Sequence, residues 1–196
     1  KAFAEKAEIK QLCEEAVRHG FASVMVNASR IPDCREYLGD SGILIGTVVS
    51  FPLGAAPVKA KVQEAAAAIE AGAAEIDYVL NIGAVKDGDF ALIRSEMRDI
   101  TQACHRLGAA VKVIFENCYL TKEEIRFVAD IAGEIQPDFI KTSTGFGTSG
   151  ALEEDVRLMK ETVGAAVAVK AAGGIRTLQS FRSMTEAGAA RIGTSN

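Results

Sequence analysis

Two lysines in this sequence end apolar stretches, and each is followed by a turn of small residues and glycine. Lys141 is the last residue of the stretch 138–141, and Lys170 is the last residue of the stretch 167–170. A lysine is rarely buried without a function, because removing an ammonium group from water costs free energy. Two lysines in one cavity also lower each other's pKa, since like charges disfavour the charged form. An amine of this kind is a nucleophile near neutral pH, which predicts Schiff-base chemistry.

Two further charged residues are expected in the same interior. Asp77 lies in a stretch with the composition of a buried strand, where alternation turns it away from its apolar neighbours. Lys112 has the corresponding place in the next such stretch. We therefore expect one charge-coupled cluster with shifted pKa values, made of Asp77, Lys112, Lys141 and Lys170. Lys112 has an alternative, in which its long side chain reaches solvent at the base of the fold.

The elements that position these residues alternate regularly along the chain. Five times a helical pattern ends at a glycine, small residues follow, and a β-rich stretch begins, as at Gly72 and Gly108. Glycine just past a helix supplies the left-handed residue of its C-terminal cap. Seven strands are predicted, over residues 21–27, 43–49, 75–80, 111–116, 138–142, 167–171 and 190–194.

Strands that alternate with helices form a parallel sheet, which is either an open doubly wound sheet or a closed barrel. No GxGxxG motif opens a helix after the first strand, which argues against a dinucleotide-binding sheet. The sequence predicts an α/β fold, a (β/α)8 TIM barrel, as one domain over residues 1–196. Because a barrel needs eight strands, we expect a first strand and a closing helix to lie outside this sequence.

The predicted barrel also has a candidate phosphate site. Gly173 and Gly174 follow the sixth predicted strand, and Gly193 and Ser195 lie at the end of the seventh. The loops after the last two strands of such barrels commonly bind phosphate through backbone N–H groups. Glycine allows the backbone to approach the anion closely. The sequence therefore predicts a phosphorylated small molecule as the ligand.

Composition excludes several other functions. The formal net charge is −4 and no block of Lys and Arg occurs, so we expect neither nucleic acid nor a membrane as a partner. The four cysteines form no CxxC pair and lie far from both histidines, so no metal site is predicted and the cysteines are expected as free thiols. No signal peptide or membrane-spanning apolar run is present, which predicts a soluble cytoplasmic protein.

Several runs of this sequence together resemble the deoxyribose-phosphate aldolase family. They cover nearly the whole chain in order and spacing, and they are residues 51–54, 75–84, 139–146, 169–177 and 191–195. The resemblance implies a class I aldolase on a (β/α)8 barrel that works without a metal or other cofactor. It also implies a homodimer that reversibly cleaves 2-deoxy-D-ribose 5-phosphate to D-glyceraldehyde 3-phosphate and acetaldehyde.

The resemblance assigns roles by position. Lys141 matches the Schiff-base lysine, Lys170 the second lysine that keeps the pKa of the first low, and Asp77 the acid of proton transfer. The expected substrate-binding residues are Lys112, Thr144, Gly173, Gly174, Gly193 and Ser195. Two alternatives stay open, a Schiff-base aldolase for another phosphorylated sugar and a non-catalytic barrel that binds a sugar phosphate.

Overall fold

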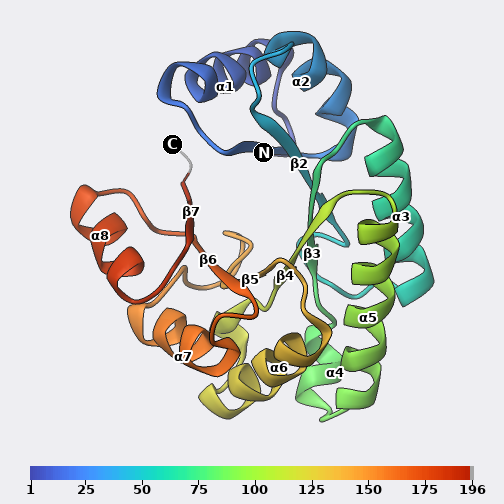
Figure 1. The fold of residues 1–196 in the computed structure, drawn as a ribbon, viewed down its shortest axis with the longest axis vertical. Coiled ribbons are helices and arrows are strands. Elements are labelled where there is room, and N and C mark those ends of the chain that lie inside the picture. The colour runs from blue at the N-terminus through green and yellow to red at the C-terminus, as the bar shows by residue number, and fades with distance from the viewer. Residues whose placement is uncertain (195–196) are drawn as a thin grey trace.

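The computed structural model describes residues 1–194 and contains one parallel sheet surrounded by helices (Figure 1). The strands are β1 (Ser23–Val26), β2 (Leu44–Val49), β3 (Glu75–Val79), β4 (Ala110–Ile114), β5 (Phe139–Lys141), β6 (Ala168–Ala172) and β7 (Arg191–Gly193). The helices are α1 (Lys6–His19), α2 (Ile31–Leu38), α3 (Val58–Ala71), α4 (Ile82–Lys86), α5 (Phe90–Arg106), α6 (Lys122–Ile135), α7 (Glu153–Val163) and α8 (Leu178–Glu186). Two short 3-10 turns, η1 (Ala28–Arg30) and η2 (Asn117–Tyr119), follow β1 and β4.

The order of the strands in the sheet is their order in the chain, and every neighbouring pair is parallel. Figure 1 shows the sheet curled on itself, with the helices on its outer side. All seven predicted strands are confirmed, with ends that differ by at most two residues. Within residues 1–194, β1 and β7 are the two edges, so the described sheet is an open curl of seven strands and not a closed ring of eight.

Glycine caps end the helices where the sequence predicts them. After α3, Gly72 has the left-handed conformation, and its N–H donates to the carbonyls of Ala68 and Ile69. Two residues later, the N–H of Ala74 donates to the carbonyl of Ile45 on β2 at 2.7 Å. The cap therefore brings the chain into the sheet at once and determines which side chains of β3 point inward.

Polar side chains cap the start of several helices. Thr121 accepts a hydrogen bond from the N–H of Glu124, and the Glu124 carboxylate accepts one from the N–H of Thr121, which forms a capping box at the start of α6. Asp89 caps α5 by accepting from the N–H of Leu92 at 3.0 Å. Each cap satisfies backbone donors that have no partner within the first turn of a helix.

Both faces of the central strand β3 are buried. Ile76 and Tyr78 face the helices, and Lys61 on α3 lies over the Tyr78 ring at 5.8 Å. The opposite face carries Glu75 and Asp77, which are also buried. A strand of a parallel sheet is normally covered on both faces. Because the face with Glu75 and Asp77 carries buried charges, these two carboxylates require positively charged partners.

The last helix contributes little to the core. α8 buries Met184, whereas Leu178 and Phe181 are 66% and 45% exposed. Only one of these three apolar side chains therefore reaches the core. None of the helices in residues 1–194 is long and apolar enough to cross a membrane.

Candidate active site

One carboxylate joins three lysines in the interior of the curled sheet. Asp77 on β3 accepts a hydrogen bond from Lys112 on β4 at Oδ1, with a distance of 2.8 Å. Its Oδ2 accepts from Lys141 on β5 at 2.9 Å and from Lys170 on β6 at 3.0 Å. The predicted cluster of these four residues is therefore present, built from four neighbouring strands.

The register of the strands explains why these side chains meet. Asp77 lies directly beside Lys112 across β3 and β4, and Lys141 lies directly beside Lys170 across β5 and β6. Neighbouring residues of a parallel sheet point to the same face, so each pair is turned to the interior together. The curl of the sheet then brings the two lysines of β5 and β6 over the carboxylate of β3.

The charges of the cluster shift each other's ionisation. Burial disfavours the ionised form of Asp77, but the attraction of Lys141, Lys170 and Lys112 outweighs burial and holds its pKa well below the ordinary value. The pKa of Lys170 is lowered to about 8, because burial and the charges of Lys141 and Lys112 together outweigh the opposing attraction of Asp77. At pH 7 about a tenth of Lys170 is then neutral, so its amine exchanges protons in the physiological range.

Lys112 is enclosed in the interior of the sheet beside the Asp77 carboxylate, and it does not reach solvent at the base of the fold. Its side chain is 0% exposed, which excludes the alternative that it reaches solvent. Its ammonium also donates to Glu75 at 2.8 Å, and Arg191 on β7 donates to the other oxygen of Glu75. Sequence reasoning missed Glu75 and Arg191, although Glu75 stands two residues before Asp77 and therefore shares its face.

Thr144 is held at the start of the loop between β5 and α7. Its N–H donates to Glu116 at 3.0 Å, and its hydroxyl donates to the second oxygen of the same carboxylate. Glu116 was expected inside the fourth strand, but β4 ends at Ile114 because Glu116 adopts a left-handed backbone with φ of 56°. The buried carboxylate thereby turns from the sheet toward the next loop and fixes Thr144.

Residues 1–195 match the family described as DeoC/LacD family aldolase. The chain belongs to this family of aldolases. A deoxyribose-phosphate aldolase from Thermococcus gammatolerans is 50% identical, over all of this chain and 88% of the relative. One from Aciduliprofundum boonei is 51% identical over the same shares of the two chains.

Solved aldolase structures share the fold. A structure described as QR15, an aldolase, is 37% identical with a TM-score of 0.92, over 99% of this chain and 86% of that one. The deoxyribose phosphate aldolase from Aeropyrum pernix, described as a tetramer, is 29% identical with a TM-score of 0.90, over 99% and 82% of the two chains. The curled sheet of this aldolase is therefore that of a TIM barrel, as the sequence predicted.

The loops after β5 and β6 pack backbone to backbone in this aldolase. Gly173 follows β6 with φ of 87°, and its carbonyl accepts a hydrogen bond from the N–H of Ala151 at 3.1 Å. A Cβ atom on Gly150 would lie 2.2 Å from the Gly173 carbonyl oxygen, which is far inside van der Waals contact. The position of Gly173 therefore depends on the absence of a side chain at Gly150.

The other expected phosphate-loop residues lie near the same end of the sheet. Gly174 follows Gly173 with φ of 77°. Gly193 ends β7, and a Cβ atom there would lie 3.4 Å from Cε of Lys170. Gly193 therefore leaves room beside the lysine amine. Ser195, which was also expected in this group, lies outside the described residues.

Gly150→Ala is expected to lower the free energy of unfolding by about 1–3 kcal/mol, because the new Cβ forces the two loops apart. Since Gly173 must then move, we expect KM for a phosphorylated substrate to rise more than kcat falls. The matched control is Gly133→Ala in α6, where a Cβ atom meets nothing within 4 Å. This control should gain about 0.5–1 kcal/mol from helix propensity. Denaturant unfolding and steady-state kinetics check both variants, and wild-type KM in Gly150→Ala would contradict the expectation.

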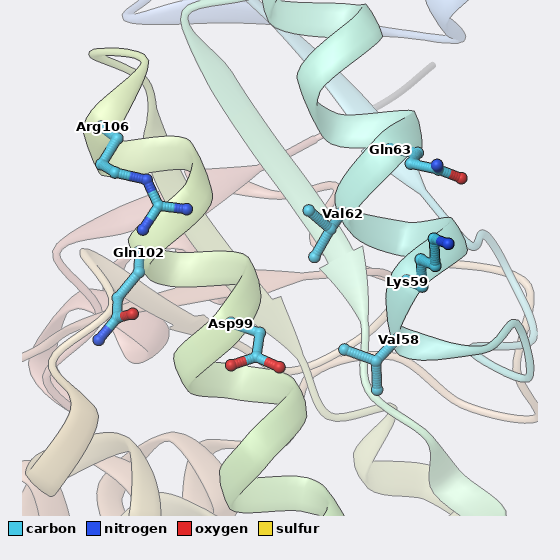
Figure 2. Close-up of a pocket in the computed structure, with 7 residues that line it drawn as sticks. All are labelled: Val58, Lys59, Val62, Gln63, Asp99, Gln102 and Arg106. Carbon is cyan, nitrogen blue, oxygen red and sulfur yellow. The ribbon is translucent and has the colours of Figure 1, made fainter.

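A surface groove of about 620 Å³ lies away from the cluster, between α3 and α5 on the outside of the fold (Figure 2). Its lining consists of Val58, Lys59, Val62, Gln63, Asp99, Gln102 and Arg106. The charged side chains of this lining are exposed, so water screens their charges. We therefore place the active site in the interior cluster.

The four cysteines are free thiols, as expected, and three of them are buried. Burial raises the pKa of Cys34 to about 12 and that of Cys104 to about 11. These two thiols are therefore protonated at neutral pH, and a protonated thiol is a poor nucleophile. Within residues 1–194, no group of three or more His, Cys, Asp or Glu side chains is arranged to hold a metal ion.

Proposed function

We propose that this aldolase reversibly cleaves 2-deoxy-D-ribose 5-phosphate to D-glyceraldehyde 3-phosphate and acetaldehyde, through a Schiff base on Lys141. The observation that carries the proposal is the Oδ2 atom of Asp77, which holds the ammonium groups of Lys141 and Lys170 at 2.9 and 3.0 Å. Because both amines contact the same carboxylate oxygen, one of them can attack the substrate carbonyl while the other exchanges protons. Relatives that match the whole chain are named deoxyribose-phosphate aldolase.

Lys141 is the amine that we assign to the attack. Its side chain is 8% exposed, compared with 4% for Lys170 and 0% for Lys112, so it is the most accessible of the three. It is also the last residue of β5, and catalytic groups of TIM barrels lie at the carboxyl ends of the strands. Lys170 is suited to accept the proton that Lys141 loses, because its own pKa is about 8.

The first half of the reaction forms the electron sink. The neutral amine of Lys141 attacks the C1 aldehyde carbon of the open-chain sugar. Lys170 returns the proton that it took from Lys141 to the hydroxyl group formed at C1, which leaves as water, and a protonated imine and a neutral Lys170 remain. The proton of the C3 hydroxyl then passes by way of Asp77 to Lys170. Because the pKa of Asp77 lies well below its ordinary value, the carboxylate relays this proton and does not keep it.

The second half of the reaction releases two products. As the C3 hydroxyl loses its proton, the C2–C3 bond breaks and its electron pair moves into the imine, which becomes an enamine. Carbons C3 to C5 leave as D-glyceraldehyde 3-phosphate. The enamine takes a proton at C2, for which Lys170 is the donor, and water hydrolyses the resulting imine to acetaldehyde and free Lys141.

Substrate binding uses the loops at the same end of the sheet. We assign the phosphate to the backbone N–H groups of Gly173, Gly174 and Gly193 together with Ser195, since left-handed and extended glycines let the backbone reach an anion. We also assign Thr144, whose N–H donates to Glu116, to contact with the sugar. Lys112 acts on the substrate through Asp77, because its ammonium is held between two carboxylates.

The rate is expected to depend on the ionisation of Lys170. A neutral amine is required to accept a proton, so kcat/KM should rise with pH and reach a plateau above about pH 8. The control variant Lys170→Gln removes this group, and its residual activity should lose the rise. Initial rates measured at constant ionic strength check the profile. A wild-type rate that is constant from about pH 6.5 to pH 9 would contradict the assignment.

Product analysis tests the reaction itself. The protein is incubated with 2-deoxy-D-ribose 5-phosphate, and acetaldehyde is detected by its reduction with an NADH-dependent dehydrogenase. We expect acetaldehyde and D-glyceraldehyde 3-phosphate in equal amounts. Release of a different aldehyde or ketone from another phosphorylated sugar, with no acetaldehyde, would favour the alternative aldolase. Binding of the sugar phosphate without any product would favour a non-catalytic barrel.

We also propose a homodimer that acts in the cytoplasm in the catabolism of deoxyribonucleotides. An acidic chain with no basic surface block suits a small-molecule substrate in that compartment. The related aldolase from Aeropyrum pernix is described as a tetramer, so larger assemblies occur on this fold. Light scattering at several protein concentrations distinguishes a dimer from a tetramer.

A further inference from the structure

A buried ion pair on the outer side of the sheet takes no part in the lysine cluster. Lys61 on α3 and Glu96 on α5 lie 2.7 Å apart, and their side chains are 0% and 1% exposed. The cost of removing two charges from water offsets much of their mutual attraction. Replacing such a pair by apolar residues is often neutral for stability, so stability alone explains this pair poorly.

The remaining bonds of the pair go to the backbone of β3. Lys61 Nζ donates to the carbonyl of Val79 at 2.8 Å, and Glu96 Oε1 accepts from the N–H of Asn81 at 3.0 Å. These two backbone groups belong to the residues on either side of Leu80, at the junction between β3 and the loop to α4. Because the two side chains also bond each other, they hold both backbone groups in one arrangement.

The ion pair stands where a neighbouring strand would otherwise supply these bonds. β2 and β3 are paired up to Val49 and Tyr78, and then Ser50 turns away with φ of 50°. The N–H of Ser50 bonds instead to Glu64 on α3 at 2.9 Å. Buried backbone groups require partners, and beyond Tyr78 the helices α3 and α5 supply them on the β2 side.

The other side of the strand end keeps its ordinary partner. The N–H of Leu80 donates to the carbonyl of Ile114 on β4 at 3.1 Å. The carboxyl end of β3 is therefore held by the sheet on one side and by Lys61 and Glu96 on the other. Loss of the ion pair would leave this end attached to β4 alone.

We propose that Lys61 and Glu96 are positioning residues of the aldolase, which fix the carboxyl end of β3 and thereby hold Asp77 against Lys141 and Lys170. Asp77 lies two residues before Val79 on the same strand. Displacing a catalytic group by about 1 Å can cost two orders of magnitude in rate, because hydrogen bonds weaken steeply with distance and angle. This inference rests on the proposed role of Asp77 in catalysis.

The test compares two double variants, each of which removes an ion-paired lysine and carboxylate between helices. Lys61→Met with Glu96→Leu removes both charges together, so that no unpaired charge remains in the core. The control, Lys122→Met with Asp155→Leu, removes the pair between α6 and α7 and also the second pair that Lys122 forms with Glu154 at the surface. Neither control side chain bonds to a β-strand. Steady-state kinetics with 2-deoxy-D-ribose 5-phosphate are measured for both, with circular dichroism to establish that each is folded.

We expect kcat of the Lys61→Met, Glu96→Leu variant to fall at least about tenfold, while KM changes by less than about threefold. The control should keep wild-type kcat. A folded variant with wild-type kcat would overturn the proposal, because a pair with only a structural role leaves the folded enzyme fully active.

A second variant covers the case in which the double variant does not fold. Lys61→Met alone leaves Glu96, whose pKa is raised by burial, so that this carboxyl can take up a proton and stay neutral. Its kcat should fall at least about threefold, and an unchanged kcat would again overturn the proposal. Wild-type protein is assayed beside it. Failure of the wild type to release acetaldehyde would contradict the proposed function, whereas the positioning role is judged only against an active wild type.

Discussion

Lys141→Ala is expected to lose at least about 10⁴-fold in kcat while the protein stays folded. The proposed reaction needs a covalent bond between this amine and C1 of the sugar, because only the protonated imine accepts the electron pair of the C2–C3 bond. Lys170 is a poor substitute for the nucleophile, since its side chain is 4% exposed and bonds to Asp77. Acetaldehyde release from 2-deoxy-D-ribose 5-phosphate measures the loss.

The fold should survive this substitution because Asp77 keeps two of its three ammonium partners. Asp77 retains Lys112 at 2.8 Å and Lys170 at 3.0 Å, so no buried charge is left without a partner. Lys141→Arg is the control, since a guanidinium keeps the positive charge but is always protonated and forms no imine. Both variants should be equally inactive. Turnover within about tenfold of wild type in Lys141→Ala would contradict covalent catalysis at this residue.

Asp77→Asn is expected to reduce both activity and stability. The carboxylate is 0% exposed and is the shared acceptor of three ammonium groups. Its neutral amide leaves Lys141 and Lys170 facing each other without a counter-ion, whereas Lys112 keeps Glu75. Breaking a buried ion pair on one side costs about 3–5 kcal/mol. Loss of the proton relay should lower kcat by about 10²–10⁴-fold.

The stability loss should depend on pH in a defined direction. The folded pKa of Asp77 lies below its ordinary value of 3.8, so its contribution to stability is present above that value and declines as the pH falls below it. The difference in unfolding free energy between wild type and Asp77→Asn should therefore be full at pH 7 and shrink on acidification below about pH 4. Urea unfolding at several pH values measures this difference. Asp130→Asn, at an exposed position of α6, is the control, and its unfolding free energy should equal that of the wild type at each pH.

The sequence was sufficient to predict the strands and the four charged residues of the interior cluster, because both depend on short-range patterns. Glycine after each helix and alternation within each strand are local features, and they placed Asp77 and Lys112 on the inner face correctly. The two lysines at the strand ends followed from the same alternation. Parallel strands in chain order then place these residues on the same face of neighbouring strands, and the curl of the sheet brings them into contact.

What the sequence did not predict depends on long-range geometry. Glu75 meets Arg191 across 116 positions of the chain, and Lys61 meets Glu96 across 35. Both contacts arise from the curl of the sheet and the packing of its helices, which no local pattern specifies. Glu116 was misplaced for a different reason, since a left-handed backbone at a residue other than glycine is rare and has no sequence signature here.

Borohydride reduction in the presence of acetaldehyde tests the central claim, which is an imine on Lys141. Acetaldehyde forms the imine with the active amine, and borohydride reduces it to a stable ethyl group that intact-mass analysis and peptide mapping locate. We expect one ethyl group per chain, on Lys141, and none in Lys141→Ala. An ethyl group on Lys170 instead, or none on a folded and active protein, would contradict the account.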